Sequence, residues 1–560
     1  MAPLGRPSRW PLATIAGLTV VAIAGTGLLL VVAGKDGPLA DSVPSSVVAS
    51  FPSIAAVLPG STPGIAATIP LVRPVFPFVG HEPWQLMHPS TPSRSIEGFA
   101  SRPSYLPGEV LQLAVSTSGT SIRASIFRVS GDAPAASPLE QVAQLPSQVG
   151  GRQAAPVVDP FTKMVAAPWS YSIAFTIPLA WPSGVYLVRL DSDEDAQSYV
   201  PFVVRSSQST RFLVVSSALT WQAYNIWGGS SLYESVLGQP QPGVTRAFAV
   251  SFDRPYATDS GAGQLFFLEL PLIAWLERQH LDLSFTTDYD LSVDPGTQPL
   301  PRAVIFNGHS EYWGVPLRLW LEDHVLRRGD FNLGVFAADS GYWPVVLSGS
   351  GPVGPRVVTS YKDGPLPDQS ADGSSNPVES SGVSESPTPP DADQDKTPSQ
   401  VSVGSFPPTG PYQGPYLGSY DVQALMGVTY QHITTAMANY TLSNPAPLPS
   451  LLDGTGIPPG SSLGYMAGGE VDAVDQGVAA STVSGDTAGA ILAAAYGIPS
   501  RSAATSVAEA VERTLPDGAT VFSSGTFYWG WALDPGFAVA HNIAFGFERM
   551  TRNLVDLLGA

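Results

Sequence analysis

The chain has 560 residues, 46 acidic against 27 basic side chains, a formal net charge of -19 and no cysteine. The missing cysteines exclude disulfides, thiolate-bound zinc, iron–sulfur clusters and thiol nucleophiles. The acidic excess offers no basic surface for a nucleic-acid backbone, so no nucleic-acid partner is expected. This length suggests two to four folding units.

An apolar run from Trp10 to Gly34 follows Arg6 and Arg9 and contains no charged residue. About 20 apolar residues can span a bilayer. The run therefore predicts a signal anchor, a transmembrane helix within residues 1–34. Basic residues before the span place the bulk of the chain outside the cytoplasm, as a single-pass protein of the cell membrane. The alternatives are secretion after cleavage of a signal, and a buried core helix.

Composition changes divide the rest of the chain. Residues 35–78 lack periodicity and are rich in Pro and Ser, which predicts a stalk. Residues 363–405 are rich in Ser, Pro and Asp with almost no large apolar side chain, which predicts a disordered acidic insertion. Residues 92–205 contain short alternating segments, typical of an antiparallel β-sandwich. The strands expected there are Val110–Ser116, Ser121–Val129, Tyr171–Ile177, Val185–Asp191 and Ser198–Val204.

In residues 210–560, longer strands alternate with helices. The expected strands are Arg211–Ser216, Asp282–Thr287, Ala303–Asn307, Phe331–Ala337 and Thr520–Phe527, and the expected helices are Leu268–His280, Val315–Arg328 and Ala540–Leu558. Crossovers of helix length imply an α/β domain with a mostly parallel, doubly wound sheet. Ligands of such sheets bind beyond the carboxyl ends of the strands.

Two of these strands end in polar strings. The string AVIFNGHSEYW, which starts at Ala303, carries His309 and Glu311 two residues apart. Alternation would put both side chains on one face. The second exit, AADSGYW, carries Asp339, so parallel pairing would bring Glu311 and Asp339 to one crevice. A surface turn with charged residues is the simpler interpretation of either exit alone.

Other strings carry weaker signals. The segment 460–464 matches the G-x-S-x-G nucleophile elbow, but it lacks the strand before and the helix after the serine that this motif requires. Acidic and histidine residues follow it at Asp472, Asp486 and His541. The strings TWQAYNIWGG, at residues 220–229, and GEVD, at residues 469–472, are aromatic or polar clusters for which packing is the simpler interpretation.

Eight strings occur in order between about residue 95 and the carboxyl terminus: SGVYLVRL, TWQAYNIWGG, SFDRPY, WLERQHLDLSFTTDYDL, GHSEYW, DSGYW, GEVD and GTFYWGWALD. Together they resemble the large (beta) subunit of N,N-dimethylformamidase. The resemblance implies a β-sandwich followed by an α/β domain of the glutamine amidotransferase type. It also implies a hydrolase with one iron ion held by two tyrosines and one glutamate.

Carried onto this sequence, the resemblance places the iron ligands at Glu311 in GHSEYW, Tyr224 in TWQAYN and Tyr186 in SGVYLVRL. It places His309 and Glu470 beside the metal or in catalysis. Phenolate and carboxylate oxygens suit a ferric ion, and three protein ligands leave positions open for water and a substrate carbonyl. His309 or Glu470 would move protons to the leaving amine.

The sequence departs from the family pattern at two positions. Ser310 stands where an acidic residue is usual, and Asp339 stands where the family has an amide. An additional carboxylate near a cation changes the local field. The departures predict either a different substrate or an impaired site.

These observations predict an extracytoplasmic, iron-dependent amidohydrolase-like enzyme that cleaves a small amide or another C–N bond, with a small subunit or a second copy as a candidate partner. One rival is a non-catalytic protein of the same fold that binds envelope carbohydrate through Trp221, Trp227 and Trp343. The other is a metal-free hydrolase that uses the carboxylate pair Glu311 and Asp339. Glycan binding that survives chelation would favour the binding protein, and amide turnover that is unaffected by chelator would favour the metal-free hydrolase. Loss of the metal should abolish the activity of the iron-dependent enzyme.

Overall fold

The computed structural model describes residues 14–15, 18–22, 29–33, 68–70, 79–90, 94–236, 239–240, 242–349, 353–360, 422–442, 449–474, 489–497 and 505–560. The chain divides into two compact units, Met1–Gly64 and Ile65–Ala560. The predicted insertion 363–405 lies outside the described residues, and so does most of the predicted stalk 35–78.

In the first unit, the described residues form three short antiparallel strands where the sequence predicted a helix. The strands are β1 (Thr14–Ile15), β2 (Leu18–Ala22) and β3 (Leu29–Ala33). Val20, Val21, Val31 and Val32 are β-branched, and such residues favour extended backbone. Within the described part of the chain, no helix is both long enough and apolar enough to cross a membrane.

The second unit begins with a sandwich of two sheets. The larger sheet has the order β10-β8-β14-β15-β6 with β9 on β8, and the smaller has the order β13-β7-β5. Apolar residues of both sheets share one buried core. The predicted strands are confirmed to within one residue at each end. The bounds are β5 Ile96–Ala100, β6 Ser104–Tyr105, β7 Val110–Thr117, β8 Ser121–Val129, β9 Leu139–Gln144, β10 Gln148–Val149, β13 Tyr171–Thr176, β14 Gly184–Ser192 and β15 Gln197–Val204.

A ten-stranded mixed sheet follows, so the prediction of a mostly parallel sheet was wrong for half of it. Strands β22, β16, β23, β25 and β32 are parallel neighbours, whereas β31, β30, β28 and β29 pair antiparallel. The connection 498–504 between β30 and β31 is too short for a crossover helix, which permits only antiparallel pairing. The strand bounds are β4 Thr68–Pro70 (on β28), β16 Phe212–Ser216, β22 Leu283–Thr287, β23 Ala303–His309, β25 Asn332–Ala338, β28 Thr429–Leu442, β29 Ser462–Ala473, β30 Gly489–Gly497, β31 Thr505–Thr514 and β32 Thr520–Ser523.

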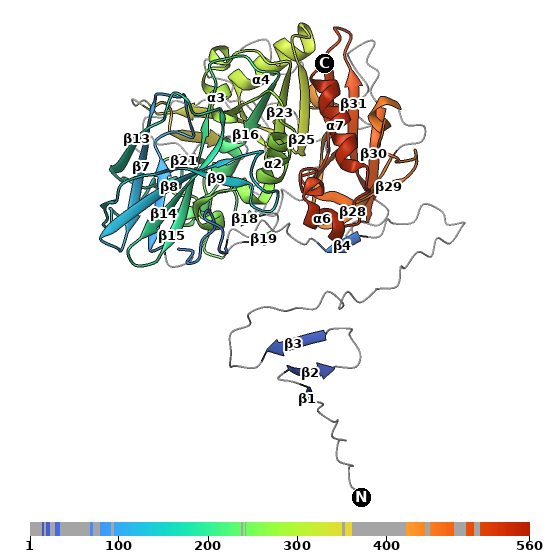
Figure 1. Cartoon of the computed structure of the whole chain (residues 1–560). Coiled ribbons are helices and arrows are strands. Elements are labelled where there is room, and N and C mark those ends of the chain that lie inside the picture. Colours follow the sequence, from blue (N-terminus) through green and yellow to red (C-terminus); the bar gives the residue numbers. More distant parts are fainter. Residues whose placement is uncertain are drawn as a thin grey trace, which may run out of the picture. The chain divides into compact units, whose positions relative to one another are not determined.

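Helices cover both faces of the parallel strands (Figure 1). In β16, Phe212 and Val214 pack with helices α2 (Leu270–Arg278) and α7 (Phe547–Leu558). Leu213 and Val215 face the opposite way, where the core includes residues of α4 (Val315–Leu321) and α5 (Val422–Met426). A strand buried on both faces reads as a continuous apolar run, which is how this segment was predicted.

Two of the three predicted helices are shorter than expected because π-helical turns replace part of them, and the third, predicted to begin at Ala540, begins at Phe547 because the preceding helix ends at Ala540. Leu265–Glu269 precedes α2 and Glu322–Arg327 follows α4 as such turns. The remaining elements are short: α1 Ala218–Ala223, α3 Asp288–Val293, α6 Pro535–Ala540, β11 Val157–Val158, β12 Val165–Ala166, β17 Ser230–Ser231, β18 Ser235–Val236, β19 Gln239–Pro240, β20 Thr245–Arg246, β21 Ala249–Ser251, β24 Tyr312–Gly314, β26 Trp343–Ser348 and β27 Val357–Ser360.

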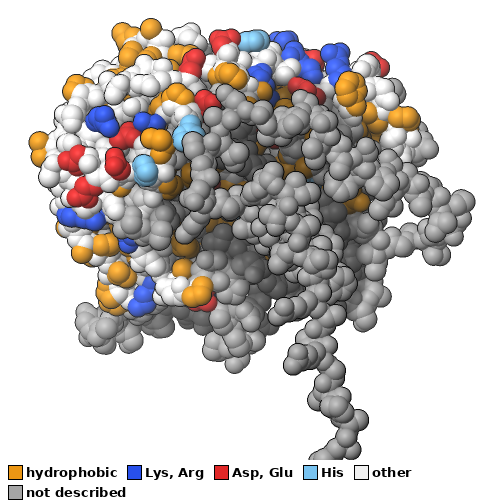
Figure 2. All heavy atoms as spheres, turned by 60° about the horizontal axis from the view of Figure 1, so that its bottom comes forward, with side chains coloured by type: hydrophobic (Ala, Val, Ile, Leu, Met, Phe, Trp, Pro, Cys, Tyr) orange, Lys and Arg blue, Asp and Glu red, His pale blue; other side chains and the backbone are white. Residues whose placement is uncertain are grey.

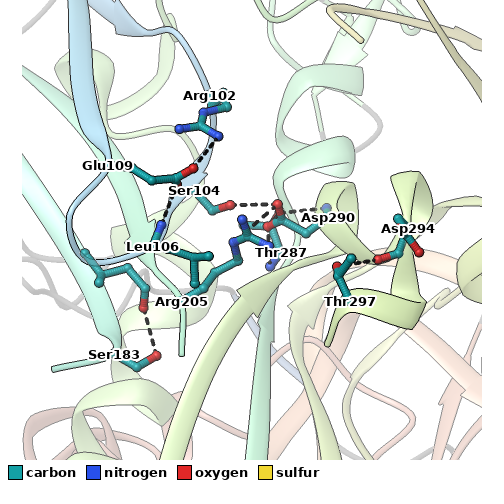
Figure 3. Close-up of polar contacts among 11 residues, drawn as sticks. Arg102, Ser104, Leu106, Glu109, Ser183, Arg205, Thr287, Asp290, Asp294 and Thr297 are labelled. Carbon is teal, nitrogen blue, oxygen red and sulfur yellow. Dashed lines mark hydrogen bonds and ion pairs between the residues drawn. The ribbon is translucent and has the colours of Figure 1, made fainter. Parts of the chain in front are cut away.

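Polar contacts join the sandwich to the large sheet (Figure 3). The hydroxyl group of Ser104, in β6, donates to Asp290 of α3 at 2.7 Å. Asp290 also closes a capping box with Thr287, so one carboxylate serves both the helix start and the junction. On the face shown in Figure 2, acidic and basic side chains are interspersed over the described surface.

Candidate metal centre

Four ionisable side chains meet beyond the ends of the central strands. His309 is the last residue of β23, Glu311 lies between β23 and β24, Asp339 follows β25, and Glu470 lies in β29. One ligand atom from each lies within 4.8 Å of the others, and all four side chains are buried. The parallel pairing of β23 with β25 explains why two strand ends deliver their polar residues to one place.

Unusual backbone at two positions shapes this group. Gly308 has φ 73°, and a Cβ there would lie 2.9 Å from Cβ of Leu268, so only glycine fits. Asp339 has φ 48°. Its N–H donates to both carboxylate oxygens of Asp472, at 2.9 and 3.1 Å, which stabilises the left-handed conformation.

Two tyrosines hold the two oxygens of Glu311. The hydroxyl group of Tyr224, directly after α1, donates to Oε2 at 2.7 Å. The hydroxyl group of Tyr233, between β17 and β18, donates to Oε1. The two rings stack with centroids 4.4 Å apart, so both phenols approach the carboxylate together.

Tyr233 was missed by the sequence interpretation, which named Tyr186 as the second tyrosine. The structure does not bring Tyr186 to this group. Its ring stacks on Trp181 and Phe202 in the sandwich core, and its hydroxyl group donates to the carbonyl group of Pro182 at 2.8 Å. Tyr233 lies in the string SLYES, which has no strand periodicity or motif that could have marked it.

His309 contacts two of these carboxyl groups. Its Nε2 lies 3.0 Å from Glu470 and 3.3 Å from Glu311. Burial alone would lower the pKa of His309, but the two glutamates raise it to about 9. Burial raises the pKa of Asp339 well above its ordinary value, and the Glu470 and Glu311 charges raise it further. Burial likewise raises the pKa of Glu470.

The group has the donors that a metal ion requires. Nδ1 of His309 and Oδ1 of Asp339 are buried without a hydrogen-bond partner among the described residues. Burial, reinforced by the Glu311 and Glu470 charges, raises the pKa of Tyr224 well above its ordinary value. A phenolate at this position therefore requires a cation beside it. Oxygen donors and one imidazole fit iron or another first-row metal ion.

Two other candidate strings have structural roles. Ser310 accepts a hydrogen bond from the Trp313 indole at 2.9 Å, which fixes the turn between β23 and β24. In the G-x-S-x-G string, the hydroxyl group of Ser462 donates to Asn439 at 2.7 Å and β29 follows instead of a helix. The ring of His541 stacks on Phe537. Asp486 lies outside the described residues.

The tryptophans proposed for carbohydrate binding are mostly buried. Trp221 is 6% exposed and donates its indole N–H to Glu269, and Trp227 is 3% exposed and donates to Glu97. Trp343 is half-buried and packs against Tyr342. These three side chains therefore do not form an exposed aromatic platform.

The family described as N,N-dimethylformamidase beta subunit-like, C-terminal, matches residues 132–543, which include every residue of the site. The chain belongs to this family. The resemblance drawn from the eight strings is thereby confirmed. As a member of the N,N-dimethylformamidase beta subunit-like family, the chain carries a buried His, Asp and Glu group that could hold a metal ion.

Similarity to other known proteins is weak. No curated protein matches the chain. Among solved structures, it is similar to a cycloisomaltooligosaccharide glucanotransferase from Paenibacillus sp. complexed with cycloisomaltoheptaose, at 11% identity and a TM-score of 0.14. The match covers 47% of this chain and 33% of that one, and at this TM-score it carries no argument about fold or function.

Proposed function

We propose that this protein is an iron-dependent amidohydrolase that cleaves the C–N bond of a small amide. One observation carries the proposal: both oxygens of the buried Glu311 carboxylate accept a tyrosine hydroxyl, from Tyr224 and Tyr233, beside the His309 and Glu470 pair. Two phenols and a carboxylate are the donor set that the family resemblance implies. Membership of the family supports the amide as substrate class.

Tyr224, Tyr233 and Glu311 would hold the metal ion. A bound ferric ion would polarise a substrate carbonyl and lower the pKa of a bound water molecule. The two tyrosine rings stack with centroids 4.4 Å apart, which keeps both hydroxyl groups against the Glu311 carboxylate. The buried setting strengthens every electrostatic interaction in the site.

The neighbouring residues handle protons. Hydrolysis adds water across the C–N bond, and the leaving nitrogen must receive a proton. His309 contacts Glu470 and Glu311, so it can take a proton from one of these groups and pass it toward the leaving nitrogen. Asp339 is buried within the same group, and in its protonated form it can donate a hydrogen bond to a substrate oxygen.

Several wider features belong to the same proposal. We place the sandwich at residues 92–205 and a catalytic domain of the glutamine amidotransferase type at residues 210–560. The apolar run within residues 1–34 motivates an extracytoplasmic location for these domains. The family's description as a beta subunit motivates a small partner subunit.

The test is turnover of N,N-dimethylformamide and simple primary amides by the full chain, measured as amine release before and after chelation. We expect activity in the iron-loaded protein, loss on chelation, and recovery when iron is restored. Glu311→Gln should remove activity, and Glu269→Gln, a buried carboxyl outside the site, should retain it. Turnover unaffected by chelator would favour the metal-free pair Glu311 and Asp339 and contradict the proposal.

A further inference from the structure

A pocket lies at the junction between the sandwich and the large sheet. Its walls come from β5, β14 and β15 on one side, and from α1, the ends of β16 and β22 and the segment after β21 on the other. The partly exposed Arg102 and Tyr256 are among its lining residues, so the pocket reaches the surface. Its volume is about 40 Å³. A water molecule needs roughly 10 to 15 Å³ of such space, so the pocket has room for a ligand a few times larger than water.

The charged side chains that line this pocket are all positive. Arg102 and Arg254 contribute guanidinium groups, and no acidic side chain among the described residues lines the pocket, although the chain has a formal net charge of -19. Arg102 pairs with Glu109 at 3.1 Å (Figure 3). Arg254 forms no ion pair with the described part of the chain, so its charge is the one that a ligand could offset.

Arg254 is fully buried. Its guanidinium group donates to the backbone carbonyl groups of Gln222, Trp227 and Ser230 and to Oε1 of Gln222, at 2.8 to 3.3 Å. Since arginine has five N–H groups, one on Nη2 has no acceptor among the described residues. Burial lowers the pKa of Arg254 to about 9, so the group stays protonated at neutral pH. A buried charge is disfavoured unless an opposite charge lies beside it, and an anion in the pocket would supply that charge.

The rest of the wall favours an anion that also has an apolar part. Phe99, Val185, Val203 and Phe252 line the pocket, and all four are buried. A carboxylate accepts charge-assisted hydrogen bonds from a guanidinium group, and a small alkyl substituent would contact the apolar wall. A halide or an inorganic phosphate has no apolar part to place there. Formate and acetate combine both parts at the size that the pocket admits.

We propose that this pocket binds a short-chain monocarboxylate such as acetate, with the carboxylate facing Arg254 and the apolar end facing the valine and phenylalanine side chains. None of the four residues of the candidate metal centre lines the pocket. Tyr224 and Tyr233 do not line it either. The pocket is therefore a separate site, and the proposal does not depend on the iron.

The test is binding of carbon-13-labelled acetate to the full chain, followed by saturation-transfer NMR. We expect saturable binding at one site per chain, with a dissociation constant in the millimolar range because so small a ligand makes few contacts. Glu311→Gln, which removes the proposed iron ligand, should bind acetate as the wild type does. This variant distinguishes acetate in the pocket from acetate bound to iron.

Two variants should weaken binding. Arg254→Met removes the charge, and loss of a charged hydrogen bond should weaken acetate binding at least about tenfold. Ala100→Leu fills the pocket from its partly exposed wall and should have the same effect, which keeps the proposal testable if Arg254→Met does not fold. Ala100→Ser, which adds little volume, and Arg328→Gln, which removes an exposed arginine outside the pocket, should bind as the wild type does.

Three results would overturn the proposal. The first is the absence of saturable acetate binding to the wild type, and the second is unchanged affinity in Ala100→Leu or in a folded Arg254→Met. The third is chloride that competes with acetate at equal affinity, which would show that the site recognises charge alone. Loss of binding in Glu311→Gln would assign the acetate to the metal centre, and would contradict this pocket while leaving the iron proposal standing.

Discussion

At the scale of single residues, the identity of the second tyrosine is the sharpest question. Tyr233→Phe removes the hydroxyl group that contacts Glu311, so we expect weaker iron binding and loss or a shift of the phenolate-to-iron absorption band. Tyr186→Phe removes a hydroxyl group that donates to Pro182 in the sandwich, and this variant should keep both the iron and the absorption band. Visible spectra of the two iron-loaded variants show which tyrosine binds the iron. The reverse pattern would restore Tyr186 as the ligand.

A second residue-scale prediction concerns Glu269, which is fully buried and is not one of the four residues of the candidate metal centre. Burial raises its pKa from 4.5 to about 7, although the Ser217 N–H and the Trp221 indole bond its Oε1. Between these values the folded state keeps a proton that the unfolded state has lost. The free energy of unfolding therefore falls as pH rises through this window, by up to about 1.4 kcal/mol per unit.

Glu269→Gln removes that share of the pH dependence, because an amide does not titrate. We expect urea denaturation between pH 5 and 7.5 to show a flatter stability profile for the variant than for the wild type. Parallel profiles would mean that Glu269 is ionised in the folded state and that its pKa is not raised.

At this scale the sequence predicted the site only in part. The GHSEYW string and the second strand exit predicted that Glu311 and Asp339 lie together, because parallel strands end at one edge. Tyr233 could not be predicted, since it lies in an irregular segment that only tertiary packing brings to Glu311. Tyr186 illustrates the opposite case, in which a plausible string supplies a core residue.

At the scale of elements, the exit from β23 depends on Gly308. Residue 308 has a left-handed backbone conformation, and Gly308→Ala would place a Cβ against Leu268. We therefore expect the free energy of unfolding to fall by more than the roughly 1 to 2 kcal/mol that the left-handed conformation alone costs. Gly456→Ala is a matched control, because Gly456 has φ 70° with nothing within 4 Å of its Cβ position.

Denaturation of both variants measures the difference, and their iron content reports whether His309 and Glu311 have moved. A Gly308→Ala variant no less stable than Gly456→Ala would show that the approach of Leu268 does not constrain the β23 exit.

Strands could be predicted from the sequence where the pattern of apolar residues matches the faces that are buried. The strand β8 has the bounds expected from its alternation, and β16, buried on both faces, reads as an apolar run. The antiparallel half of the large sheet was not predicted, because the segments of β28, β29, β30 and β31 were not recognised as strands. Consecutive strands pair there, as β30 does with β31 and β31 with β32, so the error lies in the strand assignment and not in long-range pairing.

At the scale of the whole molecule, the metal is expected to stabilise the fold. It would bind a group assembled from β23, β25 and β29, which exists only in the folded chain. Ligand at about 100 times its dissociation constant adds about 2.7 kcal/mol. We expect chelation to lower the unfolding midpoint of the wild type and to leave that of Glu311→Gln unchanged, as measured by thermal denaturation.

We propose that Glu311 and its two tyrosines, Tyr224 and Tyr233, form an iron site. Elemental analysis of the full chain tests it most directly, with Glu269→Gln as the control for loss of a buried carboxyl group. We expect at least one iron per chain in the wild type and in Glu269→Gln, and almost none in Glu311→Gln. Equal iron in all three proteins, or iron in none of them after reconstitution, would contradict it.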